Sequence, residues 1–163
     1  MNIQTILVIG AMIIFSFISL NFNGVVLKHL TNEVENKVFL TAFSLADDLI
    51  EEIKQKAFDE KTVVFTSINR EQLTTSSDLG PDVLENSPNQ FDDIDDYKGY
   101  TKYISLPHAE NYTVTANVYY VSENNQNLLS TTQTFFKRVD VKVSSPYMSN
   151  DITLSFIFTL YSK

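Results

Sequence analysis

The chain has 163 residues, enough for one domain with a sizeable core, and its 20 acidic against 12 basic residues give a formal net charge of −8. It contains no Cys and only two His, which excludes disulfides, thiolate nucleophiles and iron–sulfur clusters and disfavours a multi-histidine zinc site. The acidic balance without Lys/Arg clusters predicts that the protein does not bind nucleic acid.

The N-terminal segment is apolar and uncharged. Lys28 is the first charged residue, and all acidic residues lie at or after Glu33. Because about 20 apolar residues span the hydrocarbon core of a bilayer, we expect residues 1–24 to form a helix of a membrane or of a filament core. A cleaved secretory signal is the alternative, but it would need a basic start and a small-residue cleavage site, which fit poorly here. The expected core positions are Ile3, Leu7, Ile9, Met12, Ile13, Phe15, Phe17 and Leu20.

A helical stripe continues through residues 25–58. Apolar residues recur there at spacings of three and four, and the opposite face is charged, which predicts the amphipathic half of the same helix. We therefore predict one helix over about residues 2–58. Asn and Gly are poor helix formers, so Asn21, Asn23 and Gly24 are a candidate break within it. The stripe consists of Leu27, Leu30, Val34, Val38, Ala42, Leu45, Leu49, Ile53 and Ala57.

Residues 59–99 are polar and acidic and contain Gly80-Pro81 and Ser87-Pro88, a composition typical of a long loop. Only residues 62–66 (TVVFT) resemble a strand. Four aspartates fall within five residues, namely Asp92, Asp93, Asp95 and Asp96.

These aspartates allow two interpretations. Several carboxylates close together suit Ca²⁺, although the EF-hand spacing fails because its required Gly falls on Lys98. Aspartate side chains also accept hydrogen bonds from nearby backbone amides and cap turns. The second interpretation is favoured, and the cation site remains the alternative.

The hydrophobic period changes to two after Tyr100, which predicts four strands near residues 100–106, 112–120, 135–143 and 152–160. The expected connections are residues 107–111, 122–132 and 144–150. We therefore predict an α+β fold in residues 1–163: a long N-terminal helix with an exposed apolar half, and an amphipathic half packed against a four-stranded antiparallel sheet in residues 100–163.

Several stretches are similar to one known family. They are residues 44–60 (SLADDLIEEIKQKAFDE), 79–81 (LGP), 91–100 (FDDIDDYKGY) and 136–143 (FKRVDVKV). With the expected architecture, they resemble the type IV pilins and pseudopilins over about residues 40–160. The N-terminus departs from that family, because Thr5 stands where members usually carry Glu and no basic leader precedes it. Met1 as a mature start, a retained initiator Met, and cleavage between Gly10 and Ala11 all remain open.

The resemblance implies a structural subunit of an extracellular type IV pilus-like filament, a helical homopolymer of copies of this chain. The subunit would lie in the inner membrane before assembly, meet pilus or secretion assembly machinery, and then reach the cell surface. A membrane-anchored periplasmic pseudopilin or binding domain of a secretion system is the alternative. No cofactor is expected apart from the possible Ca²⁺, and no residue constellation suggests an enzyme.

Overall fold

The structure, a computed structural model, describes residues 2–64, 69–85, 87–107 and 109–160. Helix α1 covers Ile3–Ile53, and the short helix α2 covers Glu60–Val64. Two 3₁₀ turns, η1 (Arg70–Gln72) and η2 (Asp95–Tyr97), lie in the long connection that follows. Four strands complete the chain: β1 (Tyr100–Leu106), β2 (Ala109–Tyr120), β3 (Phe136–Ser144) and β4 (Ile152–Thr159).

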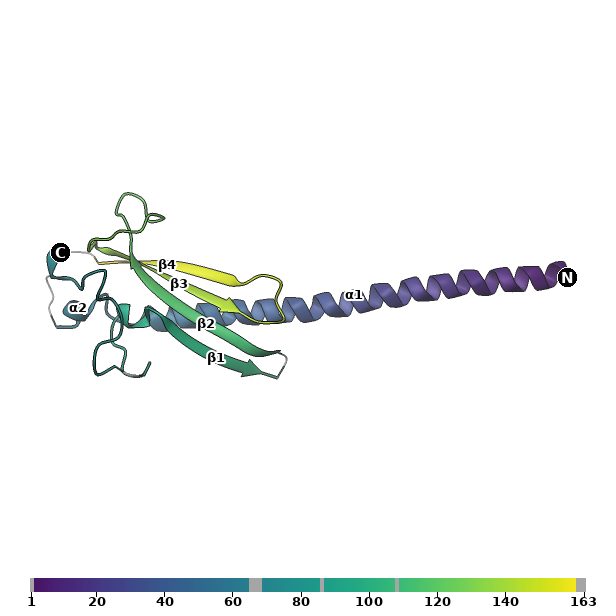
Figure 1. Cartoon of the computed structure of the whole chain (residues 1–163), viewed down its shortest axis with the longest axis horizontal. Coiled ribbons are helices and arrows are strands. Elements are labelled where there is room, and N and C mark those ends of the chain that lie inside the picture. Colours follow the sequence, from purple (N-terminus) through teal and green to yellow (C-terminus); the bar gives the residue numbers. More distant parts are fainter. Residues whose placement is uncertain (1, 65–68, 86, 108, 161–163) are drawn as a thin grey trace. The chain divides into compact units, whose positions relative to one another are not determined.

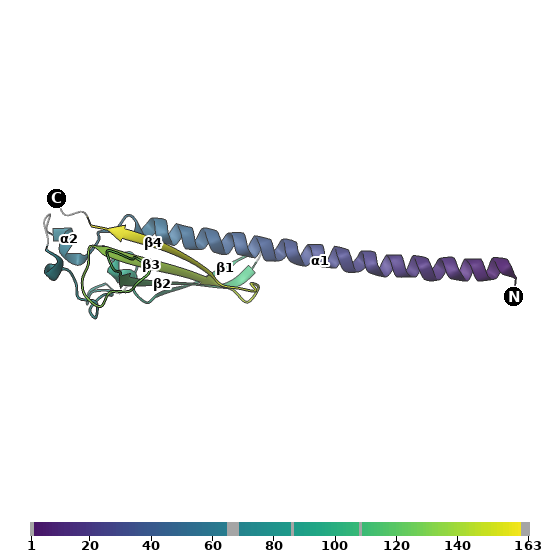
Figure 2. The same ribbon diagram turned by 90° about the horizontal axis from the view of Figure 1, so that it is seen from above.

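The chain divides into two compact units, residues 1–38 and residues 39–163. In the second unit the strands form one antiparallel sheet in the order β1-β2-β3-β4, and the last turns of α1 lie along this sheet (Figures 1 and 2). The predicted α+β class and the antiparallel meander are therefore confirmed.

The core of this unit lies between α1 and the middle of the sheet. Alternate residues of β2 and β3 are buried, as their period of two predicts. Helix α1 contributes Ala42, Ala46, Leu49, Ile50 and Ile53. The strands contribute Tyr112, Val114, Ala116, Val118, Tyr120, Val139, Val141 and Val143. On β4 only Ile152 is buried, and the ammonium of Lys54 lies 4.2 Å from the ring centroid of Phe156.

The predicted C-terminal bound of α1 is wrong. The helix ends at Ile53 instead of residue 58, because the backbone of Ala57 forms hydrogen bonds outside the helix. The Ala57 N–H donates to Asp92 O, and the Ala57 carbonyl accepts from Ile94 N, both at 3.0 Å. The helix is continuous through Asn21, Asn23 and Gly24, as the prediction of one helix requires, and the candidate break does not appear there. The propensity penalty there, about 1 kcal/mol for a Gly, does not interrupt the hydrogen-bond ladder.

The strand-like residues 62–64 belong to α2, and residues 65 and 66 of the same stretch lie outside the described residues. Local capping explains the difference. Asp59 Oδ1 accepts from Lys61 N at 3.2 Å, and Asp59 N donates to Thr62 Oγ1 at 3.1 Å. These bonds satisfy amides at the start of the helix, and they outweigh the β preference of Thr and Val.

The first connection of the sheet is also shorter than expected. Strand β2 begins at Ala109, which pairs with Leu106. Residues 109–111 of the predicted connection 107–111 therefore belong to the strand. Asn111 adopts φ +63° within this strand. That conformation breaks the regular alternation, which is why the period of two becomes visible only from Tyr112 onward.

Candidate functional site

A buried lysine lies at the centre of a polar cluster in the second unit. Lys137 pairs with Tyr120 across β3 and β2, and its side chain points to the core side, at the parity of Val139 and Val141. Its side chain is 0% exposed. The ammonium nitrogen Nζ lies 2.7 Å from Phe58 O, 2.9 Å from Asp59 Oδ2 and 2.5 Å from Asp95 Oδ1.

Asp59 is held by many donors besides Lys137. Its carboxylate accepts from the backbone N–H groups of Lys61 and Thr74, from Thr74 Oγ1 and from the hydroxyl of Tyr120. The single hydroxyl hydrogen of Tyr120 is shared between Asp59 Oδ2, at 3.2 Å, and Thr74 O, at 2.8 Å. These hydrogen bonds hold the Asp59 carboxylate in place beside Lys137.

Two aromatic rings also lie close to the ammonium group of Lys137. Its nitrogen lies 4.7 Å from the ring centroid of Phe58 and 5.3 Å from that of Tyr120. Burial, followed by the charge of Asp59, raises the pKa of Tyr120, so the hydroxyl remains a protonated donor. The cluster therefore lies in a low-dielectric environment, where charges interact strongly and desolvation is costly.

The aspartate-rich segment is mainly a capped turn, as the favoured interpretation predicted. Asp93 Oδ1 accepts from Asp95 N at 2.7 Å and from Asp96 N at 3.3 Å. Asp96 Oδ2 accepts from Asp92 N and Asp93 N, at 3.0 and 3.1 Å. These bonds wind the segment into η2 and direct Asp95 toward Lys137.

Burial changes the acidity of this turn. Desolvation, followed by the charges of Asp95 and Asp96, raises the pKa of Asp93 to about 9, so its carboxyl is neutral at physiological pH. The Asp93 carboxyl also forms a hydrogen bond with that of Asp95. Desolvation likewise raises the pKa of Asp96 to about 7. The turn therefore contains carboxyl groups that can donate a proton.

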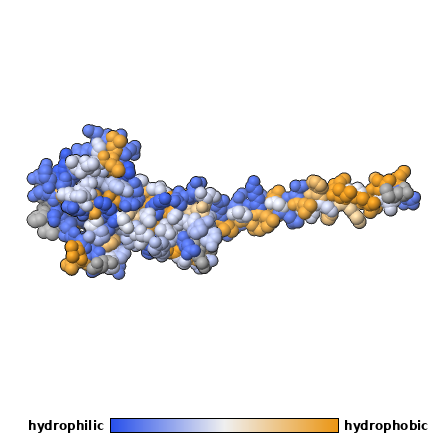
Figure 3. Space-filling model, in the orientation of Figure 1, coloured by the Kyte–Doolittle hydropathy of each residue, from blue (hydrophilic) through white to orange (hydrophobic). Residues whose placement is uncertain are grey.

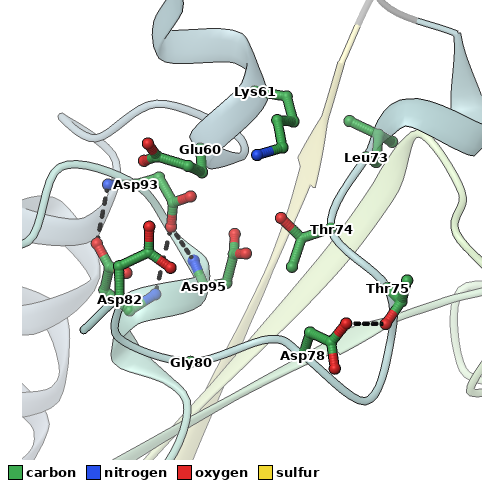
Figure 4. A pocket seen from close by; sticks show the side chains of 11 residues that line it. Glu60, Lys61, Leu73, Thr74, Thr75, Asp78, Gly80, Asp82, Asp93 and Asp95 are labelled. Atoms are coloured by element: carbon green, nitrogen blue, oxygen red, sulfur yellow. Dashed lines mark hydrogen bonds between the residues drawn. The ribbon is translucent and has the colours of Figure 1, made fainter.

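An acidic cavity of about 310 Å³ adjoins the cluster. Asp93 and Asp95 line one side of it, and Glu60, Asp78 and Asp82 contribute further carboxylates (Figure 4). Thr74, which binds Asp59, also lines the cavity. A water molecule can therefore reach Asp95 from this side, although Lys137 itself has no exposed surface.

The four predicted cation ligands do not act as one set. Among the described residues, the carboxylates that come together are those of Glu85, Asp92 and Asp96, with oxygens within 4.8 Å of one another. Asp93 and Asp95 instead bind backbone amides and Lys137, respectively. Desolvation, followed by a hydrogen bond with Glu85, raises the pKa of Asp96 within this group.

The residues predicted to lie in the membrane or in the filament core are all exposed on α1 in the single chain. They are Ile3, Leu7, Ile9, Met12, Ile13, Phe15, Phe17 and Leu20, each at least 50% accessible. Figure 3 shows the apolar side chains gathered along this part of the helix. By length and composition, α1 can cross a membrane, and a signal sequence near an N-terminus would meet the same criterion.

No family model, curated protein or solved structure matches the chain.

Sequence reasoning missed Lys137 and Asp59 as members of a site. One signal was available: Lys137 has the same parity along its strand as the buried valines, where a lysine needs a buried partner. A second was the spacing of Asp59 and Thr62, which is typical of a helix N-cap. Neither signal shows that the two residues meet, because they lie 78 positions apart.

Proposed function

We propose that this chain is the structural subunit of an extracellular type IV pilus-like filament. The observation that carries the proposal is the charge-free part of α1, on which large apolar side chains are exposed on all sides. A helix that is apolar all round must be covered by lipid or by other helices. Lipid would cover it before assembly, and sister subunits would cover it in the filament.

The second unit suits the outer surface of such a fibre. It has its own core, so it does not need the apolar segment for burial. All 20 acidic residues lie outside the first 27 residues, so the negative charge would repeat along the fibre surface. Burial of apolar area, at about 25 cal/mol per Å², would drive association of the N-terminal segments.

A membrane-anchored periplasmic pseudopilin, or a binding domain of a secretion system, is the second candidate. The observation in its favour is that a single helix of sufficient length and hydropathy accounts for an anchor without any polymer. The acidic cavity beside α2 would then be the place to look for a ligand. This candidate predicts that the chain stays in the membrane fraction.

Shearing of cells that express the full chain, followed by electron microscopy of the released fraction, separates the two. The filament proposal predicts thin fibres that contain this chain, and the anchor alternative predicts none. Replacing Phe15 and Phe17 with Ala should reduce the yield of fibres while the chain still enters the membrane. Alanine at Leu128 and Leu129, which are similarly exposed on the second unit, is the matched control and should leave the yield unchanged.

A further inference from the structure

The cluster around Lys137 contains the groups needed to form an amide bond. A nucleophilic nitrogen and a carboxyl group are in contact, since Lys137 Nζ lies 2.5 Å from Asp95 Oδ1. The carbon bonded to that oxygen is therefore also close to the nitrogen. Contact of this kind replaces a bimolecular encounter by an intramolecular one, which is a large kinetic advantage.

The two carboxylates that face Lys137 are not equivalent. Asp59 accepts hydrogen bonds from Lys61, Thr74 and Tyr120, which stabilise its negative charge and make its carbon a poor electrophile. Asp95 instead forms a hydrogen bond with the neutral carboxyl of Asp93, which can protonate it. Asp59 therefore has the environment of a base, and Asp95 that of an electrophile.

We propose that Lys137 and Asp95 join spontaneously through an intramolecular isopeptide bond between Nζ of Lys137 and Cγ of Asp95, with release of one water molecule. The starting pair is a desolvated ammonium and a desolvated carboxylate, and the product is a neutral amide. Burying the two charges is costly, so the same desolvation that penalises the ion pair favours the amide.

The reaction balances without an external reagent. Asp59 removes one proton from the Lys137 ammonium, Asp93 donates its proton to an Asp95 oxygen, and the amine attacks Cγ. In the tetrahedral intermediate the nitrogen gives a second proton to Asp93. The hydroxyl group then leaves with the proton held by Asp59, which yields the amide and water. Asp59 and Asp93 return to their starting states, and the adjoining cavity receives the water.

The bond would connect strand β3 to the turn that precedes β1, and it would enclose residues 96–136 in a covalent loop. Such a link does not require the chain to polymerise. Its test is therefore independent of the filament proposal, and either can fail without the other.

Mass spectrometry of the full chain, purified in detergent and then denatured, tests the proposal. The wild-type protein should be lighter than its sequence mass by one water molecule. Tandem spectra of a digest should show one branched peptide that joins Lys137 to Asp95. The variant Lys137→Arg keeps the cation but should show the full mass and no branched peptide.

The exposed pair of Lys142 and Asp151 is the matched control. Its Nζ–Oδ2 distance is 2.8 Å, but its side chains are 54% and 43% exposed and the pair lies outside the buried cluster. It should remain unlinked, and Lys142→Arg should still lose one water molecule. The variants Asp59→Asn and Asp93→Asn should form the Lys137 bond more slowly or not at all.

The wild-type chain alone can overturn the proposal. If a sample that is folded by the near-ultraviolet circular dichroism of its tyrosines has its full mass and an unmodified Lys137 peptide, no bond forms. A branched peptide that joins Lys137 to Asp59 would also overturn it, because the roles assigned to the two carboxylates would then be reversed.

Discussion

Lys137 and Asp95 are in direct contact inside the second unit, with 2.5 Å between Nζ and Oδ1 and at most 3% of either side chain exposed. The contact joins β3 to a turn 42 positions earlier in the chain. Through Asp59, the same ammonium also reaches the start of α2. One side chain thus ties three segments together.

Replacing Lys137 with Met should lower the free energy of unfolding of the second unit by about 3–5 kcal/mol, because Asp59 and Asp95 would stay buried without their cation. All eight tyrosines lie at or after Tyr97, so their near-ultraviolet circular dichroism reports unfolding of this unit alone. Replacing Lys142 with Met is the control. Its exposed ion pair with Asp151 should contribute at most about 1 kcal/mol, and equal losses in the two variants would contradict the role of burial.

Stability should fall as the pH rises. The folded protein holds the proton of Asp93 up to a pKa of about 9, against an ordinary value of 3.8. The folded state therefore binds more protons than the unfolded state between these values, and the free energy of unfolding decreases across this window. Asp96, with a pKa of about 7, contributes to the lower part of the same decrease.

Thermal melts from pH 5 to pH 9.5 measure this effect, and the melting temperature should decrease steadily. The variant Asp93→Asn retains an oxygen for the amides of Asp95 and Asp96, so it should fold while its melting temperature changes less between pH 7 and 9. A wild-type melting temperature that rises over this range would contradict the assignment.

Alanine substitutions at two isoleucines should distinguish residues needed for folding of the second unit from residues needed for assembly. Ile53 is fully buried, so Ile53→Ala should lower the stability of the second unit by about 2–5 kcal/mol. Ile13 is 59% exposed on α1, and Ile13→Ala should leave this transition unchanged. If the filament proposal holds, Ile13→Ala should instead reduce the yield of sheared fibres, measured relative to the amount of chain in the membrane.

Gly99 has φ +78°, a conformation that L-residues other than Gly rarely adopt. A Cβ at this position would meet no atom within 4 Å, so the cost of Gly99→Ala is conformational only. We expect a loss of about 1–2 kcal/mol, measured by chemical denaturation. A gain in stability would contradict the positive φ.

Alanine at Asn21, Asn23 and Gly24 should act in the opposite direction, because these positions are helical and a Cβ at Gly24 meets nothing within 4 Å. The gain at Gly24 is about 1 kcal/mol of helix propensity, measurable as increased helicity in detergent. If the filament requires this segment to unwind, the stiffened subunit should change the spacing or extensibility of the fibre. Unchanged spacing and extensibility would refute the hinge.

The sequence by itself determined the elements that have a clear period. The spacing of Ala42, Leu49 and Ile53 predicted the buried face of α1, and alternation predicted the inward residues of β2 and β3. Periodicity works there because each residue's environment depends on its own position along a regular element. It did not work for residues 62–64, where hydrogen bonds with Asp59 decided in favour of a helix.

Only the tertiary structure decided what the acidic segment does. In the sequence, Asp92, Asp93, Asp95 and Asp96 form one cluster, for which a capped turn is the favoured interpretation and a cation site is the alternative. Folding separates them, because Asp93 and Asp96 bind backbone amides while Asp95 meets Lys137. The charges that matter to each carboxylate come from distant parts of the chain, and a local pattern carries no information about which of them will be desolvated together.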